Sequence, residues 1–214
     1  NGEGWDDYDR DPWMEYFADE CDWSPGGQDD AHGCSLSGEF TMLNLQYIDS
    51  MQGTTPPELA LLTSLETLKI QWCDIDANFA SLIPTYLETL ENFQALLLNN
   101  NEIKGTIPSR ISRLAGLRNF NINRNFLTGT IPSNLGALTE LEFLLLYGNN
   151  FLSGTIPSEL ALATSLTSLY LYDTGISGPM PPELCNVRSL TNIRVDCVNV
   201  TCPVSCNCRC EDEQ

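Results

Sequence analysis

The sequence is poor in the residues that usually carry catalysis or nucleic-acid binding. It has one histidine, His32, and ten lysines and arginines against 29 aspartates and glutamates. A Ser–His–Asp or Cys–His arrangement needs an imidazole beside a nucleophile, and no catalytic motif surrounds His32. A formal net charge of −19 repels the phosphates that nucleic-acid-binding proteins neutralise with lysine and arginine. We therefore expect neither an enzyme nor a nucleic-acid-binding protein.

Long apolar runs are also missing. No segment approaches the roughly 18 consecutive apolar residues that a membrane-spanning helix needs. Hydrophobic residues nevertheless make up 42% of the chain, which excludes a disordered protein despite the high charge. The chain begins at Asn1 with no Met and no signal-like apolar stretch. We therefore expect a processed mature form, or an ectodomain cut from a larger protein.

The sequence does contain an internal repeat. The pattern L-x-x-L-x-L-x-x-N-x-L-x-G-x-I-P occurs four times between residues 93 and 181, with one residue inserted beside Asn149. Weaker copies begin near residues 40, 65 and 190, which gives about seven turns. The ninth position of successive copies is Asn101, Asn125 and Asn149, so the period is close to 24 residues. Periods of this length are typical of solenoids.

Each part of the repeat has a physical role. The L-x-x-L-x-L segment predicts a short strand with alternate residues in the core, and successive strands stack in parallel. The Asn can satisfy backbone groups of the turn after the strand, Gly permits an unusual backbone geometry, and Pro fixes φ. We predict an α/β repeat solenoid, a right-handed superhelix with a parallel concave sheet. Its parts are an N-terminal cap (1–39), the repeats (40–196) and a Cys-rich C-terminal cap (197–214).

The L-x-G-x-I-P segment after the Asn resembles the plant-type leucine-rich repeats. That family includes receptor-kinase ectodomains and polygalacturonase-inhibiting proteins, and the resemblance covers roughly residues 40 to 196. It implies an extracellular protein that recognises a partner. The Gly-Thr-Ile-Pro-Ser segments and the Cys-rich tail also resemble secreted repeat proteins of diatoms and related algae. The Cys21-Asp22-Trp23…Cys34 segment is similar to the cap of plant-type ectodomains, and this implies a Cys21–Cys34 disulfide, although the loop between them is longer here.

Nine cysteines, clustered at the two ends, favour disulfides in an oxidising compartment. Six lie at the C-terminal end, and their 15 possible pairings stay open: Cys185, Cys197, Cys202, Cys206, Cys208 and Cys210. Zinc is disfavoured, because the tail has C-x-C steps and no nearby histidine. Cys73 occupies the repeat position of Asn101, so we expect a buried free thiol. We predict no resident metal and no cofactor.

Two further features concern the surface. Asn199-Val200-Thr201 is an N-glycosylation sequon, which agrees with secretion. Acidic residues crowd the first 30 positions, and calcium prefers clustered carboxylates. Weak calcium binding is therefore an alternative there, although a solvated acidic surface is the simpler interpretation. The acidic residues are Asp6, Asp7, Asp9, Asp11, Asp19, Glu20, Asp22, Asp29 and Asp30.

The repeat register identifies the side chains that line the concave face. An aromatic and apolar patch is predicted in the fifth and sixth turns, and exposed aromatic patches usually mark interaction sites. An amide-rich strip, Asn99, Asn100, Asn119, Asn121 and Asn123, lies beside it. Aromatic faces beside amides suit sugar rings or a peptide backbone, and Tyr is a common interface anchor. The predicted ligand-binding residues are Phe143, Leu145, Tyr147, Tyr170, Tyr172, Asn121, Asn123, Arg124 and Trp72.

These features favour an extracellular binding module, secreted or on the cell surface, that engages a protein, peptide or polysaccharide through its concave face. A structural or adhesive cell-wall or matrix protein, with self-association, is one alternative. Inhibition of a secreted hydrolase is another, by likeness to the polygalacturonase inhibitors. We expect no direct membrane insertion by this segment.

Overall fold

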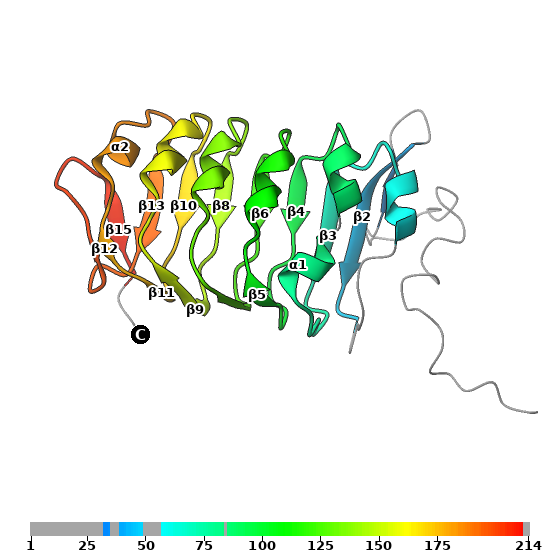
Figure 1. Cartoon of the computed structure of the whole chain (residues 1–214), viewed down its shortest axis with the longest axis horizontal. Coiled ribbons are helices and arrows are strands. Elements are labelled where there is room, and N and C mark those ends of the chain that lie inside the picture. The colour runs from blue at the N-terminus through cyan, green and yellow to red at the C-terminus, as the bar shows by residue number, and fades with distance from the viewer. Residues whose placement is uncertain (1–31, 35–38, 49–56, 84, 212–214) are drawn as a thin grey trace, which may run out of the picture.

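The computed structural model of the chain describes residues 32–34, 39–48, 57–83 and 85–211. In this part of the chain, short strands lie side by side along the long axis of the molecule (Figure 1). The main sheet contains β1 (His32–Cys34), β2 (Phe40–Gln46), β3 (Thr67–Gln71), β4 (Ala95–Leu97), β6 (Asn119–Asn121), β8 (Phe143–Leu145), β10 (Ser168–Tyr170), β13 (Asn192–Val195) and β15 (Cys208–Cys210), in that order.

The strands from β2 to β15 are parallel, and β1 pairs antiparallel with β2. The predicted solenoid with a parallel sheet is therefore confirmed. Its register follows the sequence repeat: Met42 pairs with Thr67, and the same row continues to Ala95 and Asn119. Since β1 and β15 extend the sheet beyond the repeats, strand number differs from turn number, and the count of about seven turns stays a prediction.

The core lies directly behind this sheet, because alternate residues of each strand point inward. Leu96 and Leu98 in one turn, and Phe120 in the next, are almost completely buried. Each turn then reverses through a short helical segment. These segments are η2 (Pro57–Leu61), α1 (Phe79–Leu82), η3 (Thr85–Thr89), η4 (Ser109–Arg113), η5 (Ser133–Ala137), η6 (Ser158–Leu162) and α2 (Pro182–Cys185), and most of them line one edge of the molecule in Figure 1.

A second row of short strands follows the strands of the main sheet from β4 onward. It comprises β5 (Lys104–Thr106) paired with β7 (Phe126–Thr128), β9 (Asn149–Gly154) with β11 (Thr174–Ile176), and β12 (Gly178–Pro179) with β14 (Val200–Thr201). Pro108, Pro132 and Pro157 then precede η4, η5 and η6 with φ between −67° and −74°. The proline of the repeat thus presets the backbone for the helical segment.

Buried asparagines tie the turns together. The side chain of Asn125 accepts a hydrogen bond from the Ile103 N–H (2.9 Å) and donates to the carbonyls of Leu98 (3.0 Å) and Ile122 (3.2 Å). Asn101 and Asn149 make corresponding bonds in their own turns. The predicted role of the ninth repeat position is therefore confirmed: each amide satisfies backbone groups of two successive turns.

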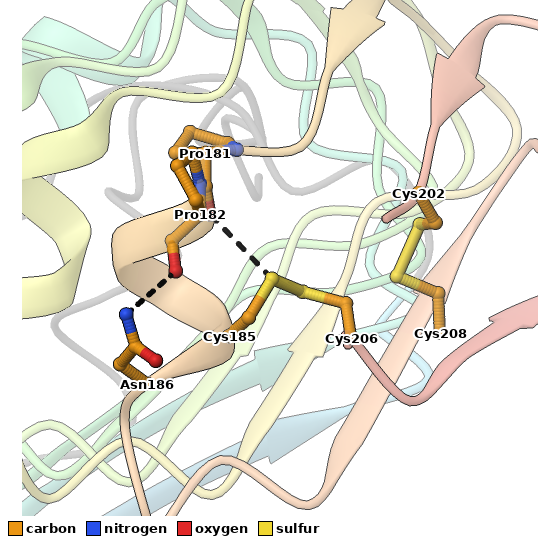
Figure 2. The surroundings of a disulfide bond; sticks show 7 residues. All are labelled: Pro181, Pro182, Cys185, Asn186, Cys202, Cys206 and Cys208. Carbon is orange, nitrogen blue, oxygen red and sulfur yellow. Dashed lines mark hydrogen bonds between the residues drawn. A yellow bond between two sulfur atoms is a disulfide. The ribbon is translucent and has the colours of Figure 1, made fainter. Parts of the chain in front are cut away.

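Three disulfides hold the C-terminal cap: Cys185–Cys206, Cys197–Cys210 and Cys202–Cys208. Figure 2 shows Cys185 on α2 facing Cys206, with the Cys202–Cys208 bond beside them. The Cα atoms of each pair lie 4.8 to 6.4 Å apart, within the range that disulfide geometry requires. The disulfides predicted for these six cysteines are thus present, with one pairing selected from fifteen. They hold β15 against β13 and close the end of the core.

Candidate binding surface

A tyrosine cluster lies on the concave side of the sheet, at the ends of the neighbouring strands β8 and β10. Tyr147 and Tyr172 stack with ring centroids 4.5 Å apart and planes inclined by 13°. The Tyr170 ring lies 6.4 Å from both and is tilted against them. All three side chains are half-buried, so they lean on one another and still reach solvent. The three predicted tyrosines therefore form one contiguous surface.

A cation and a carboxylate fix one side of the cluster. The Arg194 guanidinium lies over the Tyr170 ring, 4.8 Å from its centroid, and pairs with Glu211 at 3.2 Å. Burial, together with the neighbouring Tyr147, raises the pKa of Tyr172 to about 12. The Tyr172 phenol therefore stays protonated even in mildly alkaline solution.

Phe143 and Leu145 extend the cluster along β8. Leu145 pairs with Tyr170 across the sheet, and Phe143 pairs with Ser168 on one side and Asn119 on the other. The Phe143 side chain is 37% exposed, whereas Leu144 between them is buried. The alternation of the strand thus presents both predicted residues on the same face as the tyrosines.

The amide-rich strip lies on β6 and in the segments that follow β4 and β6. Gln71 donates a side-chain hydrogen bond to Asn99, and the Asn123 amide donates to Asn121. The side-chain oxygens (Oδ1) of Asn119 and Asn123 are buried and accept no hydrogen bond within the described residues. In the order of the strands, the predicted residues Asn121 and Asn123 belong to the turn of β6, between Trp72 after β3 and the tyrosine cluster at β8 and β10.

One set of equivalent repeat positions, just past the strand ends, has left-handed backbone. Its members are Tyr47, Trp72, Asn100, Arg124, Gly148 and Asp173, with φ between +52° and +71°. A Cβ on Gly148 would lie 2.9 Å from Cγ of Arg124, so this glycine makes room for the predicted Arg124 side chain. Arg124 is exposed beside the tyrosine cluster, whereas the predicted Trp72 lies on the far side of β4 and β6.

Trp72 is instead stacked on Tyr47, with centroids 6.3 Å apart and planes inclined by 13°. Tyr47 was not among the sequence-predicted site residues. A signal existed, because Tyr47 and Trp72 occupy the same repeat position in successive turns. We call this couple the N-terminal aromatic pair.

A different face carries a regular array of hydroxyl groups, which we call the hydroxyl face. It follows the second row of strands, and its members occupy equivalent positions of successive turns. They are all exposed: Thr106, Ser109, Thr128, Thr130, Ser133, Ser153, Thr155, Ser158 and Ser177. A groove of about 750 Å³ runs along part of it, lined by residues 130–134, 155–159 and 179–183. Phe126 (43% exposed) and Phe151 (62% exposed) border the face.

Other sequence predictions have different outcomes. Cys73 is buried and unpaired, as predicted, and burial raises the pKa of its thiol. Among the described residues, no group of three or more His, Cys, Asp or Glu side chains could hold a metal ion. Asn199, the predicted glycosylation site, is exposed. The Cys21–Cys34 bridge and the acidic cluster depend on positions outside the described residues. In the described chain, no helix is long and apolar enough to cross a membrane.

Comparisons with known proteins agree with this geometry. The model of the Leucine Rich Repeat family matches residues 116–138, 140–162 and 165–187. Comparison with curated proteins gives no sequence match. The fold is similar to the ectodomain of the Arabidopsis thaliana receptor kinase GASSHO1/SCHENGEN3 in complex with CASPARIAN STRIP INTEGRITY FACTOR 2. That likeness has a TM-score of 0.73 and 29% identity over 90% of this chain and 22% of that chain.

It is also similar to the Arabidopsis receptor kinase HAESA in complex with the peptide hormone IDA and the co-receptor SERK1 (TM-score 0.74, 29% identity, 89% of this chain and 31% of that chain). A third similar structure is a plant ice-binding protein (TM-score 0.64, 26% identity, 78% of this chain and 52% of that chain). The chain thus spans less than a third of the two receptor ectodomains. The matched segments are thus leucine-rich repeats, and the fold is that of plant leucine-rich-repeat ectodomains.

Proposed function

We propose that this chain is an extracellular recognition module that binds a peptide or protein partner through its concave face. The observation that carries the proposal is the stacked Tyr147–Tyr172 pair with Tyr170 beside it. Large aromatic side chains near the centre of a surface are the residues that most often dominate binding energy. Here they are held by one another and by the sheet, so little conformational entropy is lost when a partner arrives.

The neighbouring amides add polar recognition. A partner that places a donor near Asn119 or Asn123 could satisfy an acceptor that has no hydrogen bond within the described chain, after a small side-chain adjustment. The alternation of aromatic faces and amides suits a peptide, which offers apolar side chains and backbone N–H groups at short intervals. We therefore place a peptide or an extended protein segment ahead of a polysaccharide as the partner.

The similar structures support the same proposal. The GASSHO1/SCHENGEN3 and HAESA ectodomains are each in complex with a peptide ligand or factor. An extracellular or cell-surface location agrees with the three disulfides and with the exposed sequon at Asn199. Glycosylation at Asn199 belongs to this proposal, as does the division into two caps and a solenoid.

The test is a binding screen with two variants in parallel. The full chain is screened against a library of secreted peptides and a glycan array, together with the triple variant Tyr147→Ala, Tyr170→Ala, Tyr172→Ala. A double variant, Phe126→Ala and Phe151→Ala, is the matched control, because it removes exposed aromatics from a different face. Loss of binding in the triple variant alone supports the proposal.

Equal binding by all three proteins would place the contact elsewhere. Self-association of the wild type in sedimentation, with no ligand retained, would favour the adhesive alternative instead. Inhibition of a secreted hydrolase by the wild-type chain would favour the inhibitor alternative.

A second candidate function rests on the hydroxyl face. Nine exposed Thr and Ser side chains recur at equivalent positions of successive turns, and Lys104 holds the position of Thr128 in the preceding turn. Neighbouring turns of a solenoid are about 4.8 Å apart, so the array is periodic. A periodic array of methyl and hydroxyl groups suits ordered water, and one similar structure is a plant ice-binding protein.

Ice binding predicts that the full chain slows ice recrystallisation and shapes ice crystals. The variant Thr106→Lys, Thr130→Lys, Thr155→Lys should abolish both effects, because charged side chains break the array. The tyrosine triple variant should retain them. If the wild-type chain leaves ice growth unchanged, ice binding is excluded as a function.

A further inference from the structure

The N-terminal aromatic pair combines unusual exposure with unusual backbone geometry. Tyr47 is 72% exposed and Trp72 is 45% exposed, and their rings stack nearly parallel. Both residues have left-handed backbone, with φ of +58° and +57°. Bulky side chains seldom adopt this region, because their Cβ approaches the neighbouring carbonyl oxygen.

The fold itself does not require aromatic residues at this position. The equivalent residues in four other turns are Asn100, Arg124, Gly148 and Asp173, and all but Arg124 are of types that adopt left-handed backbone most easily. Tyr47 and Trp72 therefore bring backbone strain, and with such exposure they gain little burial in return. Strained residues whose side chains face solvent point to a role in binding.

Two exposed carboxylates follow the Trp72 position, one in its own turn and one in the next. Asp74 lies two residues beyond Trp72, and Glu102 holds the corresponding position in the next turn. The Glu102 N–H donates to the Ile75 carbonyl (3.1 Å), so the two turns run side by side here. Both carboxylates are exposed. The nearest basic residue in the strand, Lys69, is half-buried, and the whole chain carries a net charge of −19.

A cationic group suits the exposed rings of the N-terminal aromatic pair and the carboxylates that follow them in sequence. Aromatic faces attract guanidinium and ammonium groups, and nearby carboxylates add charge complementarity. The same concave face already contains one such contact, the Arg194 guanidinium 4.8 Å from the Tyr170 ring centroid. At the C-terminal end of the concave face, the cation is Arg194 of this chain. At the N-terminal end, the exposed rings of Tyr47 and Trp72 offer the same kind of surface to a cation of the partner.

We infer that the N-terminal aromatic pair, with Asp74 and Glu102, binds an arginine or lysine side chain of a basic partner segment. The inference rests on the proposed function in one respect, namely that the concave face of the sheet binds the partner. It adds a charge preference and a second anchor. The partner segment that reaches the tyrosine cluster from this pair must cross β4 and β6, at about 4.8 Å per strand step.

The experiment uses the full chain and two synthetic peptides, acetyl-(Gly-Arg)₃-amide and the same peptide with citrulline in place of arginine. Citrulline keeps the planar side chain and removes the charge. Wild type should bind the arginine peptide and not the citrulline peptide. The Tyr47→Ala/Trp72→Ala variant should bind the arginine peptide about tenfold more weakly, as expected for the loss of two cation–π contacts. Asp74→Asn/Glu102→Gln should weaken binding and flatten its dependence on salt.

The control is Phe126→Ala/Phe151→Ala, which should bind like wild type. Equal affinity for both peptides overturns the inference. So does an unchanged dissociation constant in Tyr47→Ala/Trp72→Ala, since the peptide would then follow overall charge alone. The tyrosine triple variant should keep its affinity for the arginine peptide. The arginine peptide therefore tests the N-terminal aromatic pair alone, and the binding screen tests the tyrosine cluster separately.

Discussion

Tyr147 and Tyr172 lie face to face across neighbouring turns, with ring centroids 4.5 Å apart. Both stand just past the end of a parallel strand, so the sheet spacing of about 4.8 Å brings the rings to stacking distance without backbone adjustment. The stack is therefore a direct consequence of placing tyrosine at the same position of two consecutive repeats. It makes a preformed surface that does not depend on a flexible loop.

The first prediction concerns the titration of Tyr172. Its pKa is raised to about 12, chiefly because burial disfavours the phenolate. The stability linked to this group is present below pH 10 and is lost as the pH rises through about 12, because unfolding lets the phenol ionise at its usual value. Ultraviolet absorbance of the phenolate should show one tyrosine ionising late, and Tyr172→Phe should remove that step. A titration with the late step retained in Tyr172→Phe would contradict the assignment.

The second prediction concerns the asparagine ladder. Asn125→Ala should lower the free energy of unfolding by about 3 kcal/mol, because buried backbone groups of two turns lose their partners. Urea unfolding followed by circular dichroism measures this loss. Asn150→Ala is the control, since Asn150 is exposed and its loss should change stability by less than about 0.5 kcal/mol. Equal effects of the two substitutions would show that the ladder has no special role.

The third prediction concerns the order of importance of the C-terminal disulfides. The Cys185–Cys206 bond closes 21 residues and should stabilise the protein by about 3 kcal/mol, whereas Cys202–Cys208 closes six and should contribute about 2 kcal/mol. Unfolding of Cys185→Ala/Cys206→Ala and Cys202→Ala/Cys208→Ala measures the difference. Peptide mapping without reduction checks the pairing itself. Any other pairing in that map would be incompatible with the cap described here.

The fourth prediction concerns the close packing of η5 on η6. A Cβ on Gly136 would lie only 2.0 Å from the Glu159 carbonyl oxygen, so Gly136→Ala must push two turns apart. We expect a loss of about 1–3 kcal/mol in the free energy of unfolding. Gly116→Ala, whose Cβ would lie 3.2 Å from the Phe93 carbonyl oxygen, should cost less. The opposite order in thermal or urea unfolding would show that this contact can relax.

Much of the fold follows from the sequence because each repeat determines the structure of its own turn. Alternation of Phe120 and Ile122 with polar residues fixes the inner and outer faces of a strand. The buried position of Asn125 follows from its place after that strand. Since each turn pairs only with its neighbours, the register of one repeat extends to the next, and the side chains on the concave face can be named from the sequence.

Other features depend on geometry that the repeat does not encode. The pairing of Cys185 with Cys206 requires the path of the tail, and six cysteines allow fifteen pairings. The contact of Tyr47 with Trp72 requires the left-handed backbone at both positions, which the residue types argue against. The exposure of Phe126 and Phe151 depends on the path of the second row of strands, to which both residues belong.

The central claim is that the tyrosine cluster is the contact surface for the partner. Hydroxyl-radical footprinting of the full chain, alone and saturated with the partner recovered in the screen, tests it most directly. The account predicts strong protection of Tyr147, Tyr170 and Tyr172, with Phe126 and Phe151 oxidised equally in both samples. Protection of Phe126 and Phe151 with unchanged oxidation of the three tyrosines would contradict it.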